Sequence, residues 1–329
     1  MILTVTPNPS IDRTVVLPEA LQRGEVQRIA DVLDQPGGKG VNISRACVVA
    51  GIATCAVLPA ASDDPFLREL DDLGVPHDAV PPAGPMRVNL TLTEPDGTTT
   101  KLNAPGATVA AADLDQLAQR VLARADDGWV VLAGSLPPGA PVDWYADLAA
   151  LLRAAGRRVA VDTSDAALAA VVRALEPGRA PSLLKPNAEE LASVVGADVA
   201  DLERDPGQVV AAARSLVDRG VGAVLATLGG AGAVLVDATG AWHATAPPTR
   251  VVSTVGAGDS SLFGYLAADL RGEPASARLA CAVAHGSAAA GLPGTTVPGP
   301  HDVRIHDVRV RTLDSTSPAT HEGDPSWQS

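Results

Sequence analysis

The sequence predicts an α/β protein with a mostly parallel central sheet, helices on both of its faces and a small β lid. Short runs rich in β-branched residues alternate with longer Ala- and Leu-rich stretches of helical period, which is typical of βαβ units. Two further stretches of strand-like sequence have no helix between them. The 329 residues, 46% of them hydrophobic, suffice for a large core.

The alternating part of the chain supplies the main sheet and its helices. We expect strands at residues 2–6, 53–58, 129–132, 158–161, 182–185 and 223–227. We expect helices at residues 40–50, 64–73, 111–123, 142–155, 165–175, 188–195, 206–219, 257–270 and 275–290. Parallel strands need crossover connections, and these helices can provide them.

The two stretches without helices predict the lid. Residues 14–17 are expected to pair with 27–34, and residues 87–93 with 98–103, the second pair across the turn Glu94-Pro-Asp-Gly97. Strands connected in this way cannot enter a parallel sheet, so we expect them to cover one end of it. The alternative is that they form an antiparallel edge of the main sheet.

The domain organisation follows from where the periodicity stops. We expect one domain over residues 1–300, with the lid strands inserted at about 14–34 and 87–103. From about residue 301 the chain gains Ser, Thr, Pro, Asp and His. Residues 301–329 are therefore predicted to be a C-terminal extension that is disordered from residue 314 onward.

Composition excludes several classes of protein. The net charge of −13 argues against a nucleic-acid partner and against an anionic membrane surface. The three cysteines form no Cys-x-x-Cys pair, so neither a disulfide framework nor a zinc site is indicated. There is no basic segment before an apolar run at the N-terminus, and no apolar stretch of the ~20 residues that a spanning helix needs. We therefore expect a cytoplasmic protein.

Positive charge is carried almost entirely by arginine. Of the 25 basic residues 22 are Arg, and only Lys39, Lys101 and Lys185 are Lys. Lysine supplies a compact ammonium that Arg does not replace, so its retention at these three positions suggests contacts with phosphate. Codon bias with three accidental survivors is the alternative.

The first motif with chemical content is Gln35-Pro-Gly-Gly-Lys-Gly-Val-Asn42, ahead of a predicted helix. Glycines such as Gly38 let the backbone approach a ligand, and a helix N-terminus favours anions. Lys39 adds a positive charge and Asn42 a donor on the first turn. Gly40 follows the lysine where a Walker A loop has Ser or Thr, so this is not a P-loop. A plain turn into a helix is the alternative.

The second motif is Ser253-Thr-Val-Gly-Ala-Gly-Asp259, which leads into an apolar helix. The amides of Gly256, Ala257 and Gly258 at a helix N-terminus can surround developing negative charge. Asp259 beside them can accept a proton from a hydroxyl group. Ser261 stands where a Rossmann fingerprint requires Gly or Ala. The alternative is that Asp259 only caps the helix.

The third motif is Ser182-Leu-Leu-Lys-Pro-Asn-Ala-Glu-Glu190. A strand ends at Lys185, and Asn187 can cap the following helix. Ligands of an open parallel sheet bind at the carboxyl ends of its strands, so Lys185 is expected at phosphate and Asn187 with Glu190 around the waters of a metal ion.

Other candidates lie on the lid and at strand ends. Alternate positions of a strand share one face, so the pairs Arg87 with Asn89 and Lys101 with Asn103 can each present a cation and an amide to a sugar phosphate. A solvated lid face is the alternative. Asp12, just beyond the first strand, and Ser135 can bind sugar hydroxyls. The loop that contains Thr227, Gly229 and Gly232 suits a nucleotide and a hairpin turn equally well.

Together these motifs resemble the ribokinase superfamily in its phosphofructokinase-B branch. The resemblance runs from residue 2 to about 298 and rests on the signatures Pro36-Gly-Gly-Lys-Gly-Val-Asn42 and Thr254-Val-Gly-Ala-Gly-Asp259. The segment 185–190 matches the family's Asn-x-x-Glu element. Within the branch, the opening segment 6–12 and Arg87-Val-Asn89 are similar to kinases that act on already phosphorylated sugars. With the segments 101–106 and 286–294, the resemblance is closest to bacterial 1-phosphofructokinases.

The resemblance implies a ribokinase-like three-layer α/β/α fold and ATP-dependent phosphorylation of fructose 1-phosphate at its 6-hydroxyl. It implies Asp259 as the base, Lys185 and the loop 227–232 at ATP, and Mg²⁺ held through water by Asn187 and Glu190. The sugar phosphate is expected at Asp12, Gly38, Lys39, Asn42, Arg87, Asn89, Lys101, Asn103 and Ser135. A monovalent cation and a homodimer through the lid are compatible with it. The alternatives are a tagatose-6-phosphate kinase, a 6-phosphofructokinase, and a non-catalytic sensor of sugar phosphate or nucleotide on the same fold.

Overall fold

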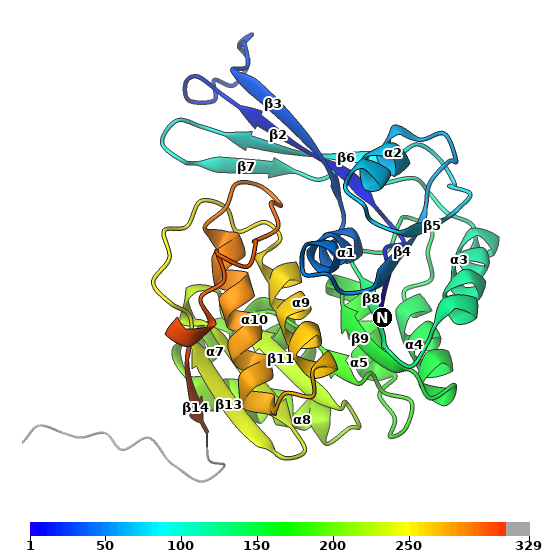
Figure 1. Ribbon diagram of the computed structural model, residues 1–329, viewed down its shortest axis with the longest axis vertical. Coiled ribbons are helices and arrows are strands. Elements are labelled where there is room, and N and C mark those ends of the chain that lie inside the picture. Colours follow the sequence, from blue (N-terminus) through cyan, green and yellow to red (C-terminus); the bar gives the residue numbers. More distant parts are fainter. Residues whose placement is uncertain (314–329) are drawn as a thin grey trace, which may run out of the picture.

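The computed structural model describes residues 1–313, and a ten-stranded sheet runs through its centre (Figure 1). From one edge to the other its strands are β14 (Arg309–Thr312), β13 (Gly240–Thr245), β12 (Ala233–Asp237), β11 (Ala223–Thr227), β10 (Leu183–Leu184), β9 (Arg158–Asp162), β8 (Trp129–Ala133), β1 (Ile2–Val5), β4 (Thr54–Pro59) and β5 (His77–Val80).

The sheet is parallel over most of its width, as predicted. Every neighbouring pair from β5 to β11 is parallel, whereas β11 to β14 pair antiparallel. Strands buried on both faces consist of continuous apolar runs, and all five residues of β8 are buried. The carboxyl ends of the parallel strands therefore meet at one edge of a rigid core.

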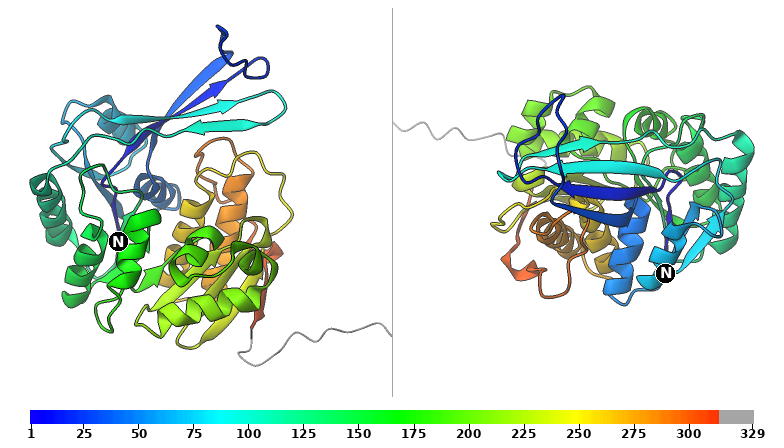
Figure 2. Two further views of the ribbon diagram at one scale, coloured as in Figure 1. Left: turned by 180° about the vertical axis from the view of Figure 1, so that it is seen from behind. Right: turned by 90° about the horizontal axis from the view of Figure 1, so that it is seen from above.

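Helices cover both faces of this sheet, which confirms the three-layer architecture (Figures 1 and 2). One layer contains α3 (Ala111–Arg124), α4 (Trp144–Ala154), α5 (Asp165–Arg173), α6 (Ala188–Val195), α7 (Val199–Arg204) and α8 (Pro206–Val217). The other contains α1 (Lys39–Val49), α2 (Pro65–Asp72), α9 (Ala257–Leu270) and α10 (Ala275–Ala290). Alternate side chains of a strand serve the two layers: Leu3 and Val5 pack toward the first, and Ile2 toward the second.

The lid is a separate four-stranded sheet that projects from the body (Figure 2). Its strands, in spatial order, are β3 (Asp31–Gly37), β2 (Ser10–Val16), β6 (Arg87–Thr93) and β7 (Thr99–Leu102). The two outer pairs are antiparallel, and β2 lies parallel to β6. The alternative placement of these strands at an edge of the main sheet is thus wrong. That antiparallel edge is formed by β12, β13 and β14 instead.

Several short elements escaped the sequence pattern. These are β5, β12, β13, β14 and α7, each of four to six residues. β14 alternates Arg with Val and Thr at the edge of the sheet, where charged residues discourage pairing with other chains. Because of these charges its sequence lacks the apolar run by which a strand is recognised. It carries the sheet past residue 300. The predicted disorder of residues 314–329 lies outside the described residues.

The position of Asp12 differs from the expectation. Since β2 begins at Ser10, Asp12 lies within a lid strand, whereas we expected it just beyond the first strand.

Over residues 1–313, no helix combines the length and the apolar character needed to cross a membrane.

Candidate active site between the sheet and the lid

A cleft of about 780 Å³ opens where the carboxyl ends of the parallel strands face the lid. Thr6, Gly134 and Lys185 line it from the sheet, and Ser10 and Asn89 line it from the lid. The structure brings nearly all the predicted site residues to this cleft: Asp12, Gly38, Lys39, Asn42, Arg87, Asn89, Asn103, Ser135, Lys185, Asn187, Glu190, Thr227, Gly229, Gly232, Gly256, Ala257, Gly258 and Asp259.

Lys101 is the predicted residue that does not line the cleft. It pairs with Thr91 across β6 and β7, and its side chain is exposed. The structure therefore separates Lys101 from the other two lysines of the chain.

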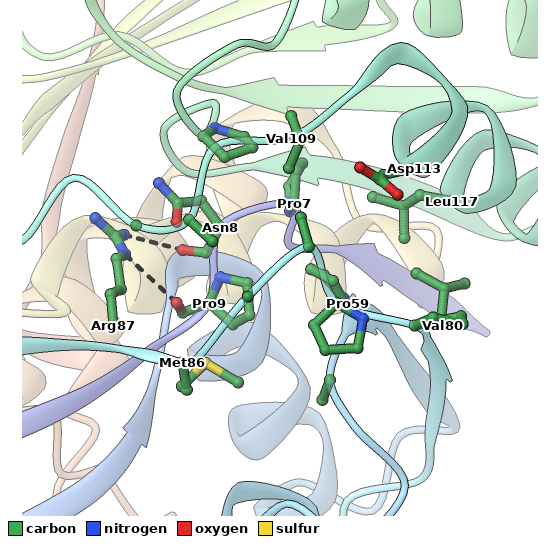
Figure 3. Close-up of a pocket in the computed structure, with 18 of the residues that line it drawn as sticks. Pro7, Asn8, Pro9, Pro59, Val80, Met86, Arg87, Val109, Asp113 and Leu117 are labelled. Carbon is green, nitrogen blue, oxygen red and sulfur yellow. Dashed lines mark hydrogen bonds between the residues drawn. The ribbon is translucent and has the colours of Figure 1, made fainter.

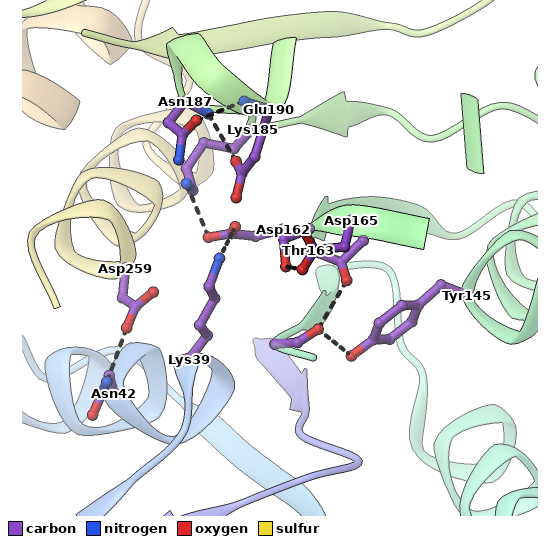
Figure 4. A network of polar contacts seen from close by, with 12 residues as sticks. Lys39, Asn42, Tyr145, Asp162, Thr163, Asp165, Lys185, Asn187, Glu190 and Asp259 are labelled. Carbon is purple, nitrogen blue, oxygen red and sulfur yellow. Dashed lines mark hydrogen bonds and ion pairs between the residues drawn. The ribbon is translucent and has the colours of Figure 1, made fainter. Parts of the chain in front are cut away.

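Lys39 and Lys185 converge on one buried carboxylate, Asp162 at the end of β9 (Figure 4). The Lys39 Nζ lies 2.6 Å from Asp162 Oδ1, and the Lys185 Nζ lies 3.1 Å from Oδ2. Burial alone would raise the pKa of Asp162, but the two ammonium groups hold it below the usual value. Burial likewise opposes the charge of Lys39, and its acidic neighbours, Asp162 first, outweigh this and raise its pKa.

The glycines ahead of α1 are required by the close approach of two chain segments. Gly38 has φ +110°, and a Cβ there would lie 2.8 Å from Thr6 Cγ2. This turn starts α1 directly at Lys39. Asn42 follows three residues later, and because residues three apart share a helix face, Lys39 and Asn42 both face the cleft.

The N-terminus of α9 forms the opposite wall. Gly256, with φ +77°, starts the helix, and Ala257, Gly258 and Asp259 make up its first turn. The N–H groups of a first turn have no partner within their own helix, so they are available to an anion in the cleft. Lys185 Nζ lies 3.4 Å from where a Cβ of Gly258 would be, so glycine leaves room for the ammonium beside this turn.

Asp259 is buried in that first turn, and its Oδ2 accepts a hydrogen bond of 2.9 Å from Asn42 Nδ2 (Figure 4). Burial and the nearby charge of Asp162 raise the pKa of Asp259 to about 6, against the opposing effects of Lys39, Asn42 and Lys185. A carboxylate with such a pKa is ionised at neutral pH and can still accept a proton, as a general base must.

Asn187 and Glu190 form a capping box at the start of α6. The Glu190 N–H donates to Asn187 Oδ1 at 2.8 Å, and the Asn187 N–H donates to Glu190 Oε2 at 2.9 Å. Each side chain therefore has one oxygen engaged, and Glu190 keeps a second oxygen at the cleft. No group of three or more His, Cys, Asp and Glu within residues 1–313 could cage a metal ion. This sparse donor set suits Mg²⁺, which keeps several waters and shares its ligands with phosphates.

Polar groups of the lid face the cleft. Asp12 Oδ1 accepts from Ser10 Oγ at 2.8 Å and from Asn89 Nδ2 at 3.1 Å. Thr6 Oγ1 and Asn89 Oδ1 are buried without a hydrogen-bond partner among the described residues. Buried polar groups are nearly always paired, so these two point to a hydroxyl-bearing ligand.

Arg87 has a second task besides facing the cleft (Figure 3). It donates to the carbonyls of Asn8 at 2.9 Å, Pro9 at 3.4 Å and Ala104 at 2.9 Å. Arg87 therefore joins its own strand, β6, to the segment at residues 8–9 and to the segment that contains Ala104. Behind these segments lies a smaller cavity of about 40 Å³. A guanidinium has five N–H donors, so two remain for an anion in the cleft.

The glycine loop after β11 is a hairpin connection that also lines the cleft. It joins the antiparallel strands β11 and β12 as a hairpin connection, and Thr227, Gly229 and Gly232 also line the cleft. Apolar and small residues of the segment 246–255 and of α10 continue this wall: Ala246, Pro247, Pro248, Val251, Val255, Val283, Gly286 and Ala290.

Comparison with known proteins identifies the family. The family model described as "pfkB family carbohydrate kinase" matches residues 5–302. The chain belongs to the pfkB family of carbohydrate kinases. The 1-phosphofructokinases of Rhodobacter capsulatus and Haloferax volcanii are each 37% identical to this kinase, over 95% and 94% of its chain and 98% and 97% of theirs.

Solved structures agree with this assignment. Phosphofructokinase-2 of Escherichia coli, in complex with substrates and products, superimposes on the kinase with a TM-score of 0.84 at 30% identity, over 92% of this chain and 96% of that one. The same enzyme in complex with potassium gives a TM-score of 0.83 at 29% identity, with the same coverage of both chains. The predicted family, fold and enzyme class are thus confirmed: the protein is a phosphofructokinase-type sugar kinase.

Sequence reasoning missed Asp162, which organises the two cleft lysines. Its signal was available, since an acidic residue directly follows the apolar run Val159-Ala-Val161 at a strand's carboxyl end. It also did not name Thr6, Asn8 and Ser10 as site residues, although they belong to the opening segment 6–12 that supports the resemblance. The segment 246–255 gives no pattern that separates a nucleotide wall from an ordinary loop.

Proposed function

We propose that this kinase transfers the γ-phosphoryl group of ATP to the 6-hydroxyl of fructose 1-phosphate, giving fructose 1,6-bisphosphate. One observation carries the chemistry: a buried carboxylate, Asp259, lies in the first turn of α9 and lines the cleft. Asp259 takes the proton of the attacking hydroxyl. The amides of Gly256, Ala257 and Gly258 stabilise the charge on the transferred group.

The sugar phosphate occupies the half of the cleft under the lid. The unpartnered Thr6 Oγ1 and Asn89 Oδ1 support this placement, and so do the polar groups of Asp12, Asn42, Asn103 and Ser135. The existing phosphate binds at the two free N–H groups of Arg87, with Lys39 nearby. Gly38 lets the backbone reach the sugar. Lys101, exposed outside the cleft, is not part of this proposal.

ATP occupies the other half, along the loop 227–232 and the segment 246–255. Lys185 contacts its phosphates, and the Asn187–Glu190 pair orders waters around Mg²⁺. When bound, Mg²⁺ neutralises phosphate charge. The potassium in the E. coli phosphofructokinase-2 structure supports the proposal of a monovalent cation here as well.

The choice of sugar rests on the relatives. Identity to the two 1-phosphofructokinases, at 37%, exceeds the 30% to phosphofructokinase-2. The decisive experiment measures kcat/KM with fructose 1-phosphate, fructose 6-phosphate and tagatose 6-phosphate, with ADP release as the readout. The highest value should be that for fructose 1-phosphate. A higher value for another sugar would show that this sugar is the preferred substrate. Tight binding without ADP release would indicate a sensor.

We further propose that two copies associate through their lids. Val32, Val88 and Leu102 expose 41%, 37% and 55% of their surface on one lid face. Exposed apolar side chains on an open sheet invite association. Sedimentation velocity should show a dimer that Leu102→Asp disrupts, and a wild-type monomer would contradict the proposal.

A further inference from the structure

Arg45 is a buried cation that forms no direct ion pair among the described residues. It lies on α1 with only 8% of its surface exposed, and it forms no salt bridge with any residue from 1 to 313. It does not line the cleft, and the mechanism above does not use it. Burying a charge is costly unless it is paired, so its retention calls for a reason.

Arg45 is connected through Asn42 to Asp259, the proposed base. Its Nη1 donates to Asn42 Oδ1 at 3.4 Å, to Thr295 Oγ1 at 3.3 Å and to the Pro36 carbonyl at 3.3 Å. On the other side of the same amide, Asn42 Nδ2 donates to Asp259 Oδ2 at 2.9 Å.

These partners leave the Asn42 amide a single orientation. A guanidinium only donates hydrogen bonds, and an ionised carboxylate only accepts them. The amide oxygen must therefore face Arg45, and the amide nitrogen must face Asp259. Without Arg45 the amide could rotate by half a turn when Asp259 is protonated and accept a hydrogen bond from the carboxyl group, which would favour the protonated form of Asp259.

The same contacts reach the lid. Thr295 Oγ1 donates to Gln35 Oε1 at 3.2 Å, and the Thr295 N–H approaches the same oxygen at 3.4 Å. Gln35 belongs to β3 and pairs with Asp12 of β2. A continuous chain of polar contacts thus runs from the lid through Thr295, Arg45 and Asn42 to Asp259.

We propose that Arg45 is a positioning residue: it holds the Asn42 amide so that Asn42 donates to the base, and it ties this arrangement to the lid through Thr295. The inference rests on the proposed role of Asp259. The charged groups that act on Asp259 are Asp162 of β9, Lys39 of α1 and Lys185 after β10, and the acidic group that acts on Arg45 is Asp12 of β2. None of these changes when Arg45 is replaced.

The test is the pH profile of kcat/KM in Arg45→Met, because this quantity reports the ionisation of the free enzyme. Loss of the oriented donor to Asp259 should move the acidic limb upward by about one pH unit. The value of kcat/KM at pH 6 should then fall about fivefold, whereas the value at pH 8 should stay near wild type. Arg45→Lys, which can still donate to Asn42, should restore the wild-type profile. Arg153→Met is the matched control, because it removes a half-buried Arg of α4 that donates to the backbone carbonyls of Arg157 and Ala180.

Two further variants separate positioning from a structural role. In an Asn42→Ala background, Arg45→Met should have no additional effect on the profile, because Arg45 acts through Asn42. Thr295→Val should shift the acidic limb in the same direction, and it provides the test if Arg45→Met does not fold. An unshifted limb, an equal loss of kcat/KM at every pH, or additive effects with Asn42→Ala would overturn the inference. A wild type inactive with all three sugars would instead contradict the proposed function.

Discussion

The Lys39 ammonium lies 2.6 Å from a carboxylate oxygen of Asp162, a residue 123 positions further along the chain. Lys39 comes from the start of α1, and the Lys185 ammonium, which binds the other oxygen, comes from the end of β10. Asp162 therefore holds the two cleft lysines close together, between the proposed sugar and ATP halves of the site. Its own charge also raises the pKa of Asp259.

Asp162→Asn should alter both properties at once. Removing the negative charge lowers the pKa of Asp259, so the acidic limb of the kcat/KM profile should move below about pH 6. Lys185, 4% exposed, loses a buried partner, so the free energy of unfolding should fall by about 3 kcal/mol or more. The pH dependence of kcat/KM measures the first effect, and urea denaturation measures the second. Asp127→Asn, at an exposed ion pair with Arg157, serves as the control.

A profile that stays in place would show that Asp162 does not act on the base. An unchanged stability would show that the two lysines find other partners once the carboxylate is removed.

Asp259→Asn should separate activity from stability. Turnover should fall by several orders of magnitude, because the hydroxyl loses its proton acceptor, while ATP affinity changes little. The folded pKa of about 6 exceeds the unfolded value of about 4, so this group stabilises the fold below about pH 4 and loses that contribution as the pH rises through 6. At pH 7 the substitution should therefore stabilise the protein by about 1–3 kcal/mol. Substantial residual turnover would contradict the base assignment.

The sequence predicted the parts of this site that carry a local signature. Gly38 and Gly256 mark positions where the backbone adopts a positive φ, and each precedes a helix that presents charged or polar residues. Such features follow from a few neighbouring residues. The nine long helices and the six buried strands were predictable for the same reason.

The parts that the sequence did not predict depend on contacts between distant segments. The partnership of Asp162 with Lys39 and Lys185 arises only when β9, β10 and α1 are assembled. The exclusion of Lys101 from the cleft depends on how far β7 extends beyond the body of the protein. The spacing of residues along a strand indicates which side chains share a face, but not how far that part of the strand lies from the cleft. The edge strand β14 and its neighbour β13 have mixed polarity because only some of their side chains are buried.

The three lysines should respond differently to replacement by arginine. Lys39→Arg and Lys185→Arg should each lower kcat/KM about tenfold or more, because a planar guanidinium cannot replace a compact ammonium between Asp162 and a phosphate. For Lys185 the first turn of α9 leaves little space, since a Cβ of Gly258 would already lie 3.4 Å from its Nζ. Lys101→Arg should leave kinetics unchanged. A large effect at Lys101 would indicate that β7 closes over the cleft during turnover.

Glu190→Gln should reveal which role of the capping box matters to catalysis. The glutamine oxygen can still accept the Asn187 N–H bond of 2.9 Å, so the start of α6 and the melting temperature should be preserved. The substitution removes the carboxylate charge that faces the cleft, so half-maximal activity should require a higher Mg²⁺ concentration, by about tenfold for a lost ligand-shell contact. Glu189→Gln, one residue earlier and exposed, should leave the Mg²⁺ dependence unchanged. If Glu190→Gln lowers the melting temperature without shifting the Mg²⁺ dependence, Glu190 serves the helix alone, because a carboxylate that orders metal-bound water cannot lose its charge without weakening that shell.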